Sequence, residues 1–175
     1  YNIQERPDAQ QCSRNYGGNF RDWDVIKGMT DGPFVELVDG NLKDWNTMIK
    51  LSNDSSVLET RDQNFSPYRE LSKFLNYDHY VDSIFLRIWA GDVDWIRSRN
   101  ELGITGNRNK NWYASRNRVR SEGFIFFPWD VEFTMGKTHG GSKNIDLNLT
   151  DIHINNSPAT MYTALKGNPE FRLKF

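Results

Sequence analysis

Residues 78–91 carry the pattern that most constrains the fold of this 175-residue chain. Apolar side chains recur there at the three- and four-residue spacing of a helix, over a stripe wide enough to be buried. The stripe consists of Val81, Ile84, Phe85, Ile88 and Trp89. Asp78 is placed to cap the start of this helix, and Gly91 is placed to end it in a left-handed conformation. The sequence therefore predicts a helix whose apolar side packs into the core.

Shorter patterns on both sides of this helix predict the other elements. Residues 41–58 resemble a second helix with one apolar face, and Pro67 is suited to the first turn of a third. Residues 124–129 are short, apolar and aromatic, which is typical of a buried strand. One more helix is expected around residues 161–165, whereas residues 1–40 read as irregular.

Composition excludes several classes of protein. The net charge is -1, which argues against a general nucleic-acid-binding protein, because such proteins usually have a basic balance. No run approaches the ~20 apolar residues of a membrane-spanning helix, so an integral membrane protein is not expected. The single cysteine, Cys12, excludes an internal disulfide and a zinc site built from cysteines. The three histidines are too scattered to indicate a metal site.

Three polar residues follow or precede strongly apolar segments, where rigid support would hold them in place. Asp94 comes just after the long helix, Asn111 precedes an aromatic pair, and Asp130 ends the aromatic strand. Carboxylate and amide oxygens can share a divalent cation, and a second carboxylate can accept the proton of a hydroxyl group. Residues 97–120 carry seven basic residues against one acid, a charge that could face a triphosphate.

Each of these residues also has an ordinary structural explanation. Asp92 and Asp94 could be loop residues, Asn111 could stabilise a turn, and Asp130 could cap one. A basic segment is usually a solvated surface. The phosphate-binding patterns GxxxxGK[ST] and GxGxxG are both absent from the sequence. Spacing alone therefore leaves the function open.

Eight segments in order give a more specific indication. They are YNIQERPD at 1–8, DVIK at 24–27, DGN at 39–41 with Trp45, WAGDVDW at 89–95, NWY at 111–113, FFPWDVE at 126–132, NNSP at 155–158 and NPEFR at 168–172. Together they resemble the CotH kinase family, the spore-coat-type atypical protein kinases of bacteria. The resemblance extends over nearly the whole chain.

The resemblance implies an α+β, atypical protein-kinase-like fold, mainly the helical C-terminal lobe with a short β segment. The implied activity is transfer of the γ-phosphoryl group of ATP to a protein acceptor, with Mg²⁺ or Mn²⁺ as cofactor. Asp94 would be the acidic residue of the catalytic loop that positions the acceptor hydroxyl, and Asp130 would bind the metal. Asn111 would be a second metal and cofactor ligand, and Glu5 would pair with the lysine that contacts the nucleotide.

Two departures from the family pattern stand out. Asp92 occupies a position where the family often has asparagine, which adds negative charge beside Asp94. The chain also begins inside the pattern, so residues 1–175 are expected to be a single CotH-like domain from a longer polypeptide, without its upstream strands and with further domains possible. Family habit places it outside the cell or on the cell surface.

Two alternatives stay open at this point. The chain could be a non-catalytic surface module that binds protein or polysaccharide, for which six Trp and seven Tyr would be suitable. It could instead hydrolyse phosphoesters with a metal ion, with water in place of the acceptor hydroxyl.

Overall fold

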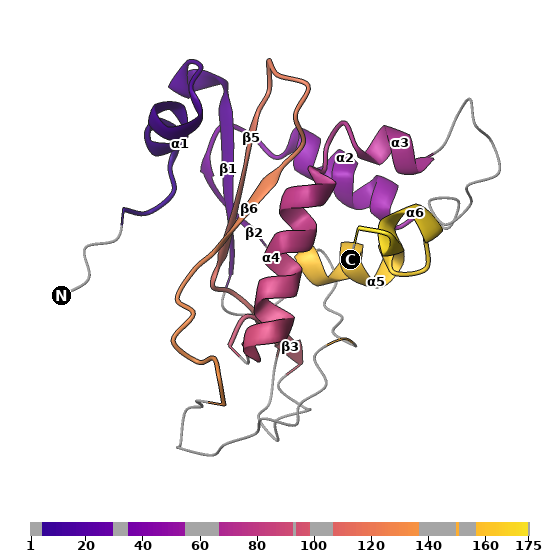
Figure 1. Ribbon diagram of the computed structural model, residues 1–175. Coiled ribbons are helices and arrows are strands. Elements are labelled where there is room, and N and C mark those ends of the chain that lie inside the picture. The colour runs from indigo at the N-terminus through magenta and orange to yellow at the C-terminus, as the bar shows by residue number, and fades with distance from the viewer. Residues whose placement is uncertain are drawn as a thin grey trace.

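The computed structural model describes residues 5–29, 35–54, 67–92, 94–98, 107–136, 150 and 157–174. These residues form an α+β structure of helices and antiparallel strands (Figure 1). The elements are α1 Ala9–Tyr16, a 3-10 turn Phe20–Asp22, β1 Trp23–Gly28, β2 Val35–Asp39, α2 Lys43–Ser52, α3 Pro67–Leu71, α4 Tyr77–Ala90, β3 Ile96–Ser98, β4 Asn107–Asn109, β5 Trp112–Asn117, β6 Ile125–Pro128, α5 Pro158–Leu165 and α6 Pro169–Arg172.

The main sheet has four strands in the order β2-β1-β5-β6, and every neighbouring pair is antiparallel. A separate hairpin pairs β3 with β4. The sheet is more extensive than the short β segment expected from the resemblance, because β1 and β5 form its centre. All six residues of β5 are buried. A strand covered on both faces does not alternate between apolar and polar residues, so the basic segment gave no strand signal.

Helices cover both faces of this sheet (Figure 1). On one face α1 packs over a small cluster that includes Cys12, Trp23 and Tyr113. On the other face the remaining helices enclose the main core, in which Trp45 stacks on Trp112 with ring centroids 5.5 Å apart. The high aromatic content of the sequence is largely used in this core.

The long helix forms as predicted, but its cap and its buried face differ from the expectation. Asn76, not Asp78, caps α4 by accepting a hydrogen bond from the backbone N–H of His79. Phe85 and Trp89 are 52% and 65% exposed, although both belong to the predicted stripe. The helix is therefore rotated about its axis relative to the predicted orientation, because tertiary contacts decide which face is buried. The side chains that point inward include Tyr77, Tyr80, Ile84 and Arg87.

The three other predicted helices and the aromatic strand are present, and Pro67 is the first residue of α3 as expected. The helix expected over 41–58 is described over Lys43–Ser52, and the C-terminal one begins at Pro158. Strand β6 occupies Ile125–Pro128. Within the described residues, no helix combines the length and the apolar character needed to cross a bilayer.

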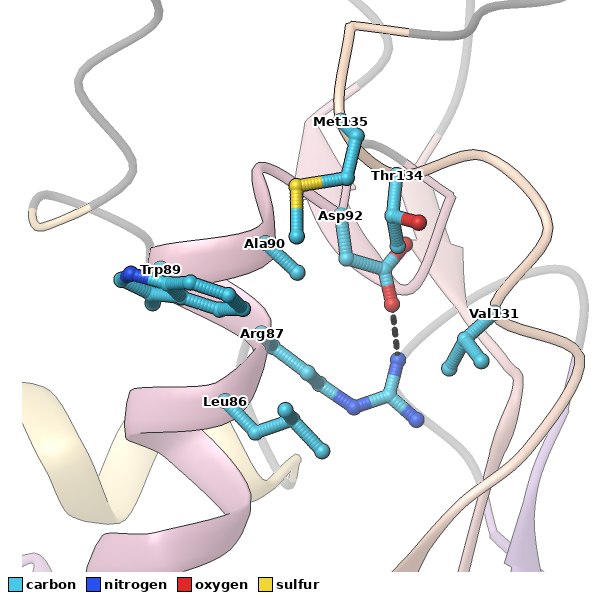
Figure 2. Close-up of a pocket in the computed structure, with 8 residues that line it drawn as sticks. All are labelled: Leu86, Arg87, Trp89, Ala90, Asp92, Val131, Thr134 and Met135. Atoms are coloured by element: carbon cyan, nitrogen blue, oxygen red, sulfur yellow. Dashed lines mark hydrogen bonds and ion pairs between the residues drawn. The ribbon is translucent and has the colours of Figure 1, made fainter.

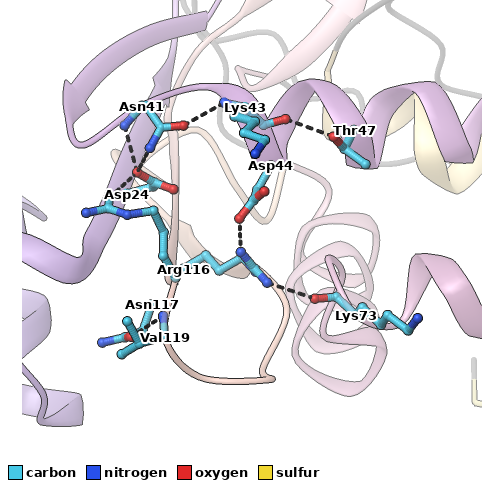
Figure 3. A network of polar contacts seen from close by, with 10 residues as sticks. Asp24, Asn41, Lys43, Asp44, Thr47, Lys73, Arg116, Asn117 and Val119 are labelled. Carbon is cyan, nitrogen blue, oxygen red and sulfur yellow. Dashed lines mark hydrogen bonds and ion pairs between the residues drawn. The ribbon is translucent and has the colours of Figure 1, made fainter.

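The basic segment is part of the interior polar network, not only a solvated surface (Figure 3). Arg116, on β5, forms an ion pair with Asp44 at the start of α2 and donates to the backbone carbonyl of Lys73. Arg118 pairs with the fully buried Asp24 at 2.5 Å. The contacts of Arg116 attach the sheet to α2 and to the end of α3, whereas the pair of Arg118 and Asp24 joins the end of β5 to β1.

Cys12 provides a test of this packing. It lies on the buried side of α1 and is fully buried, and burial raises the pKa of its thiol. Since the thiolate is the reactive form, we expect iodoacetamide at pH 8 to label the folded chain far more slowly than the urea-unfolded chain. The sequence has one cysteine, so mass spectrometry reports this site alone. Equal labelling rates in the two states would contradict the buried position of α1.

Candidate functional site

The three polar residues singled out from the sequence come together in the structure. Helix α4 ends at Gly91, whose φ of 64° is the left-handed conformation predicted for it, and the chain then turns to Asp94. Asn111 precedes β5 and Asp130 follows β6. Because β5 and β6 pair with Trp112 opposite Pro128, the residues just beyond them are neighbours as well.

Asn111 connects the other two residues. Its side-chain Nδ2 donates to the backbone carbonyl of Asp94 at 2.8 Å and to Asp94 Oδ2 at 3.1 Å. The same nitrogen lies 3.5 Å from the backbone carbonyl oxygen of Asp130. The carbonyl oxygen of Asn111 in turn accepts from the N–H of Trp129 at 2.9 Å. One amide side chain thus joins three segments that are far apart in the sequence.

Two of these residues have a left-handed backbone conformation. The φ angles are 63° at Asn111 and 54° at Asp130. Asn and Asp tolerate this region better than other non-glycine residues, and such conformations persist where surrounding contacts hold them. Strand β6 stops at Pro128, so Asp130 lies two residues beyond the end of the strand and not at its last position.

A pocket of about 320 Å³ opens beside these residues. Asn111 and Asp130 lie on its wall, together with Trp112, Tyr113 and Trp129. Three basic residues also line it: Arg6, Lys27 and Lys110. Lys110 Nζ lies 2.8 Å from Asp94 Oδ2, which places Asp94 directly behind this wall. The pocket therefore combines a carboxylate, an amide and an excess of positive charge.

Gly28 also lines this pocket and has a steric reason to be glycine. A Cβ at this position would lie 2.4 Å from the backbone oxygen of Asn109 and from Trp112 Nε1. The end of β1 can approach the residues before β5 only without a side chain there. The neighbouring Lys27 is paired with Glu36 at 3.1 Å.

Glu5 is not brought together with the other predicted site residues. Its carboxylate forms an ion pair with Arg14 of α1, and both side chains are largely exposed. The next residue, Arg6, lines the pocket, but Glu5 is not among the lining residues.

The donor chemistry of the site suits a divalent cation of the magnesium type. Because the amide nitrogen of Asn111 is committed to Asp94, its amide oxygen is the atom available as a ligand. The Asp130 carboxylate lies on the same pocket wall. Mg²⁺ is commonly held by one or two protein oxygens, with water and phosphate completing its shell. Among the described residues, no three His, Cys, Asp or Glu side chains converge into a metal-binding group.

A buried ion pair behind the site was not found by sequence reasoning (Figure 2). Arg87, in the last turn of α4, is 2% exposed, and its Nη1 nitrogen lies 2.5 Å from Asp92 Oδ2. Both residues line a second pocket of about 180 Å³, whose other walls are mainly apolar. The negative charge that Asp92 adds beside Asp94 is therefore balanced within the protein.

Burial acts on both members of this pair. It raises the pKa of Asp92 from 3.8 to about 6, against the opposing effect of Arg87 and with a further upward effect of Glu132. It lowers the pKa of Arg87 to about 10, and Asp92 opposes that change. Both groups are therefore charged at neutral pH.

These shifts predict how stability depends on pH. Because the pKa of Asp92 is higher in the folded chain, its stabilising contribution is fully present below pH 3.8 and is lost as the pH rises through about 6. The double variant Arg87→Met/Asp92→Asn, which lacks both charges, is the reference. Relative to it, we expect the free energy of unfolding of the native chain to fall by up to about 3 kcal/mol as the pH rises from below 3.8 to above 6. It should then stay level to pH 9. Urea titrations at several pH values measure the difference, and a rise over the same range would contradict the assignment.

Comparisons with family models, with curated proteins and with solved structures each find no match.

Proposed function

We propose that this chain is a CotH-like atypical protein kinase domain, which transfers the γ-phosphoryl group of ATP to a hydroxyl group of a protein acceptor. One observation carries the proposal. Asp94, Asn111 and Asp130 come from three separate segments, and the Asn111 amide joins Asp94 to the backbone carbonyl of Asp130. Asn111 and Asp130 line a pocket together with three basic side chains, and Asp94 lies directly behind its wall. This is the arrangement that the family resemblance requires of these residues.

The charge of the pocket supports a polyphosphate as its ligand. Arg6, Lys27 and Lys110 are all basic, whereas Asp130 is the one acid among the residues lining this pocket. Phosphoryl transfer depends mainly on positioning and on neutralisation of phosphate charge. These three basic side chains, which come from different parts of the chain, would position the phosphate groups and neutralise their charge.

Asp94 would act on the acceptor. In the proposed step the acceptor oxygen forms a bond to the γ-phosphorus, the bond from that phosphorus to ADP breaks, and the acceptor proton passes to the Asp94 carboxylate. Asp94 is 1% exposed and Lys110 lies against it, so the acceptor reaches it after Lys110 turns towards a bound phosphate. The Asn111 amide would keep the carboxylate oriented throughout.

Asp130 and the amide oxygen of Asn111 would hold Mg²⁺ or Mn²⁺. When bound, the cation would offset the negative charge of the phosphate oxygens.

Nucleotide-dependent stabilisation tests the binding half of the proposal. With Mg²⁺ and ATP at a hundred times the dissociation constant, we expect the melting temperature to rise by roughly 5–10 °C, from about 2.7 kcal/mol of binding linkage. ATP without the metal, and the metal without ATP, should give much smaller shifts. No shift under any of these conditions would favour the non-catalytic binding module.

Labelled γ-phosphate then separates transfer from hydrolysis. A kinase moves the label into a protein acceptor, which can be the chain itself or a mixture of bacterial surface proteins. A phosphoesterase releases it as inorganic phosphate in the absence of any acceptor. Release without protein labelling in all acceptor mixtures would overturn the kinase proposal.

A further inference from the structure

We infer that Arg87 and Asp92 form a positioning pair, which fixes Asp94 and Asn111 relative to each other without touching the substrate. The inference takes the roles of Asp94 and Asn111 from the proposed function. The position of the pair itself is a property of the fold.

Arg87 reaches two separate segments from the end of α4. One terminal nitrogen of its guanidinium, Nη1, pairs with Asp92 Oδ2 at 2.5 Å, and the other, Nη2, donates to the backbone carbonyl of Asn111. Its guanidinium carbon lies 4.8 Å from the centre of the Trp95 ring, so its flat face is held as well. A planar fork with two fixed donors is the feature that distinguishes arginine from lysine in such a position.

Asp92 divides its two oxygens between Arg87 and the catalytic turn. Oδ2 faces Arg87, whereas Oδ1 accepts from the backbone N–H of Asp94 at 3.0 Å. The turn is closed from the other side, because the N–H of Asp92 donates to the carbonyl of Arg87 at 2.9 Å. Arg87 thereby holds Asp94 through Asp92.

Asn111 needs this support for a specific reason. Its backbone is left-handed, and its carbonyl oxygen accepts from both Arg87 and the N–H of Trp129. If the Arg87 contact is removed, the peptide loses one of the two bonds that hold this conformation. A rotation there would move the amide side chain away from Asp94.

A purely structural role explains the pair less well. Replacing a buried ion pair by neutral residues of similar volume is often neutral or stabilising, so such a pair is weak evidence for a contribution to stability. This pair, however, connects the two sides of the site, at residues 94 and 111. Neither member lines the pocket next to Asp130, so neither is proposed to contact the nucleotide.

The double variant Arg87→Met/Asp92→Asn distinguishes a positioning role of the pair from a purely structural one. Methionine approximates the length of the arginine side chain without its donors, and asparagine keeps an acceptor for the N–H of Asp94. We expect a melting temperature close to that of the native chain, but displaced NMR signals for the side-chain amide of Asn111. Phosphoryl transfer should fall by about 10–100-fold, mainly in kcat and not in KM for ATP.

Arg87→Lys provides the conservative test and keeps the inference testable if the double variant does not fold. A lysine ammonium can pair with Asp92 but lacks the fixed fork that also reaches Asn111. The backbone N–H signal of Asp94 should therefore stay in place, while the Asn111 amide signals shift.

A second ion pair, in which Arg116 is buried and Asp44 is partly exposed, serves as the control. Arg116→Met/Asp44→Asn removes the ion pair between β5 and α2, and it should leave the NMR signals of Asn111 and Asp94 unchanged. Native Asn111 signals in both Arg87 variants would overturn the inference, and so would equal shifts in the control. If the native chain transfers no phosphate at all, the proposed function fails, while the NMR comparison still decides whether the pair positions these residues.

Discussion

Replacing Asp130 with asparagine is expected to abolish both Mg²⁺-dependent binding of ATP and phosphoryl transfer. The reason is electrostatic, because an amide oxygen lacks the charge with which a carboxylate holds a divalent cation. The fold should be unaffected: Asp130 is exposed, and asparagine tolerates the φ of 54° found there. Calorimetric titration with ATP, with and without Mg²⁺, measures the loss directly.

Glu132→Gln is the matched control for this variant. It removes the same charge two residues away from another exposed position, so the two variants change the net charge equally. We expect it to retain metal-dependent binding within about twofold, because exposed charges act weakly through water. Equal losses in both variants would show that Asp130 acts through the general field of the surface and not as a ligand.

The parts of the fold that could be predicted are those that depend on local pattern. Helix α4 and strand β6 carry strong periodic or apolar signals, and Gly91 supplies the left-handed residue at the helix end. The cap was misassigned because Asn76 and Asp78 are equally suitable side chains two positions apart. Which face of α4 is buried depends on the sheet and on α5, so no local pattern could settle it.

The central strands β1 and β5 could not be recognised in the same way. Both are flanked on each side by other strands and covered on both faces, so polar residues within them are paired internally instead of exposed. Asp24 and Arg116 interrupt any apolar run, and their partners are distant in sequence. A charge pattern read along the chain cannot reveal such pairs.

In the site, too, features set by local sequence were predicted and those set by distant contacts were not. The sequence predicted Asp94, Asn111 and Asp130 from rigid segments and from the resemblance, and the structure brings these three together. The Arg87–Asp92 pair was missed because arginine at that position fits an ordinary amphipathic helix. Its role depends on a contact to Asn111, 24 positions further along the chain.

Replacing Asp94 with asparagine should separate binding from turnover. The variant keeps the size of the side chain and an oxygen for the Asn111 amide, but it cannot take up the acceptor proton. We expect phosphoryl transfer to fall by a factor of ~10² to 10⁴, with ATP affinity unchanged or slightly higher. Affinity should not fall, because the variant weakens the ion pair that holds Lys110 against Asp94, and this lysine also lines the pocket. Single-turnover transfer of labelled phosphate, set beside calorimetric ATP binding, measures both quantities.

Asp82→Asn provides the reference for this comparison, because Asp82 lies exposed on α4, outside both pockets, and the chemical change is identical. It should transfer phosphate at the native rate. If Asp94→Asn lost ATP affinity as completely as Asp130→Asn, the two carboxylates would share one function as metal ligands, and the assignment of Asp94 to the acceptor would be wrong. A native transfer rate in Asp94→Asn would show that the acceptor proton leaves by another route. The proposed division between a proton-accepting and a metal-binding carboxylate therefore depends on these variants failing in different measurements.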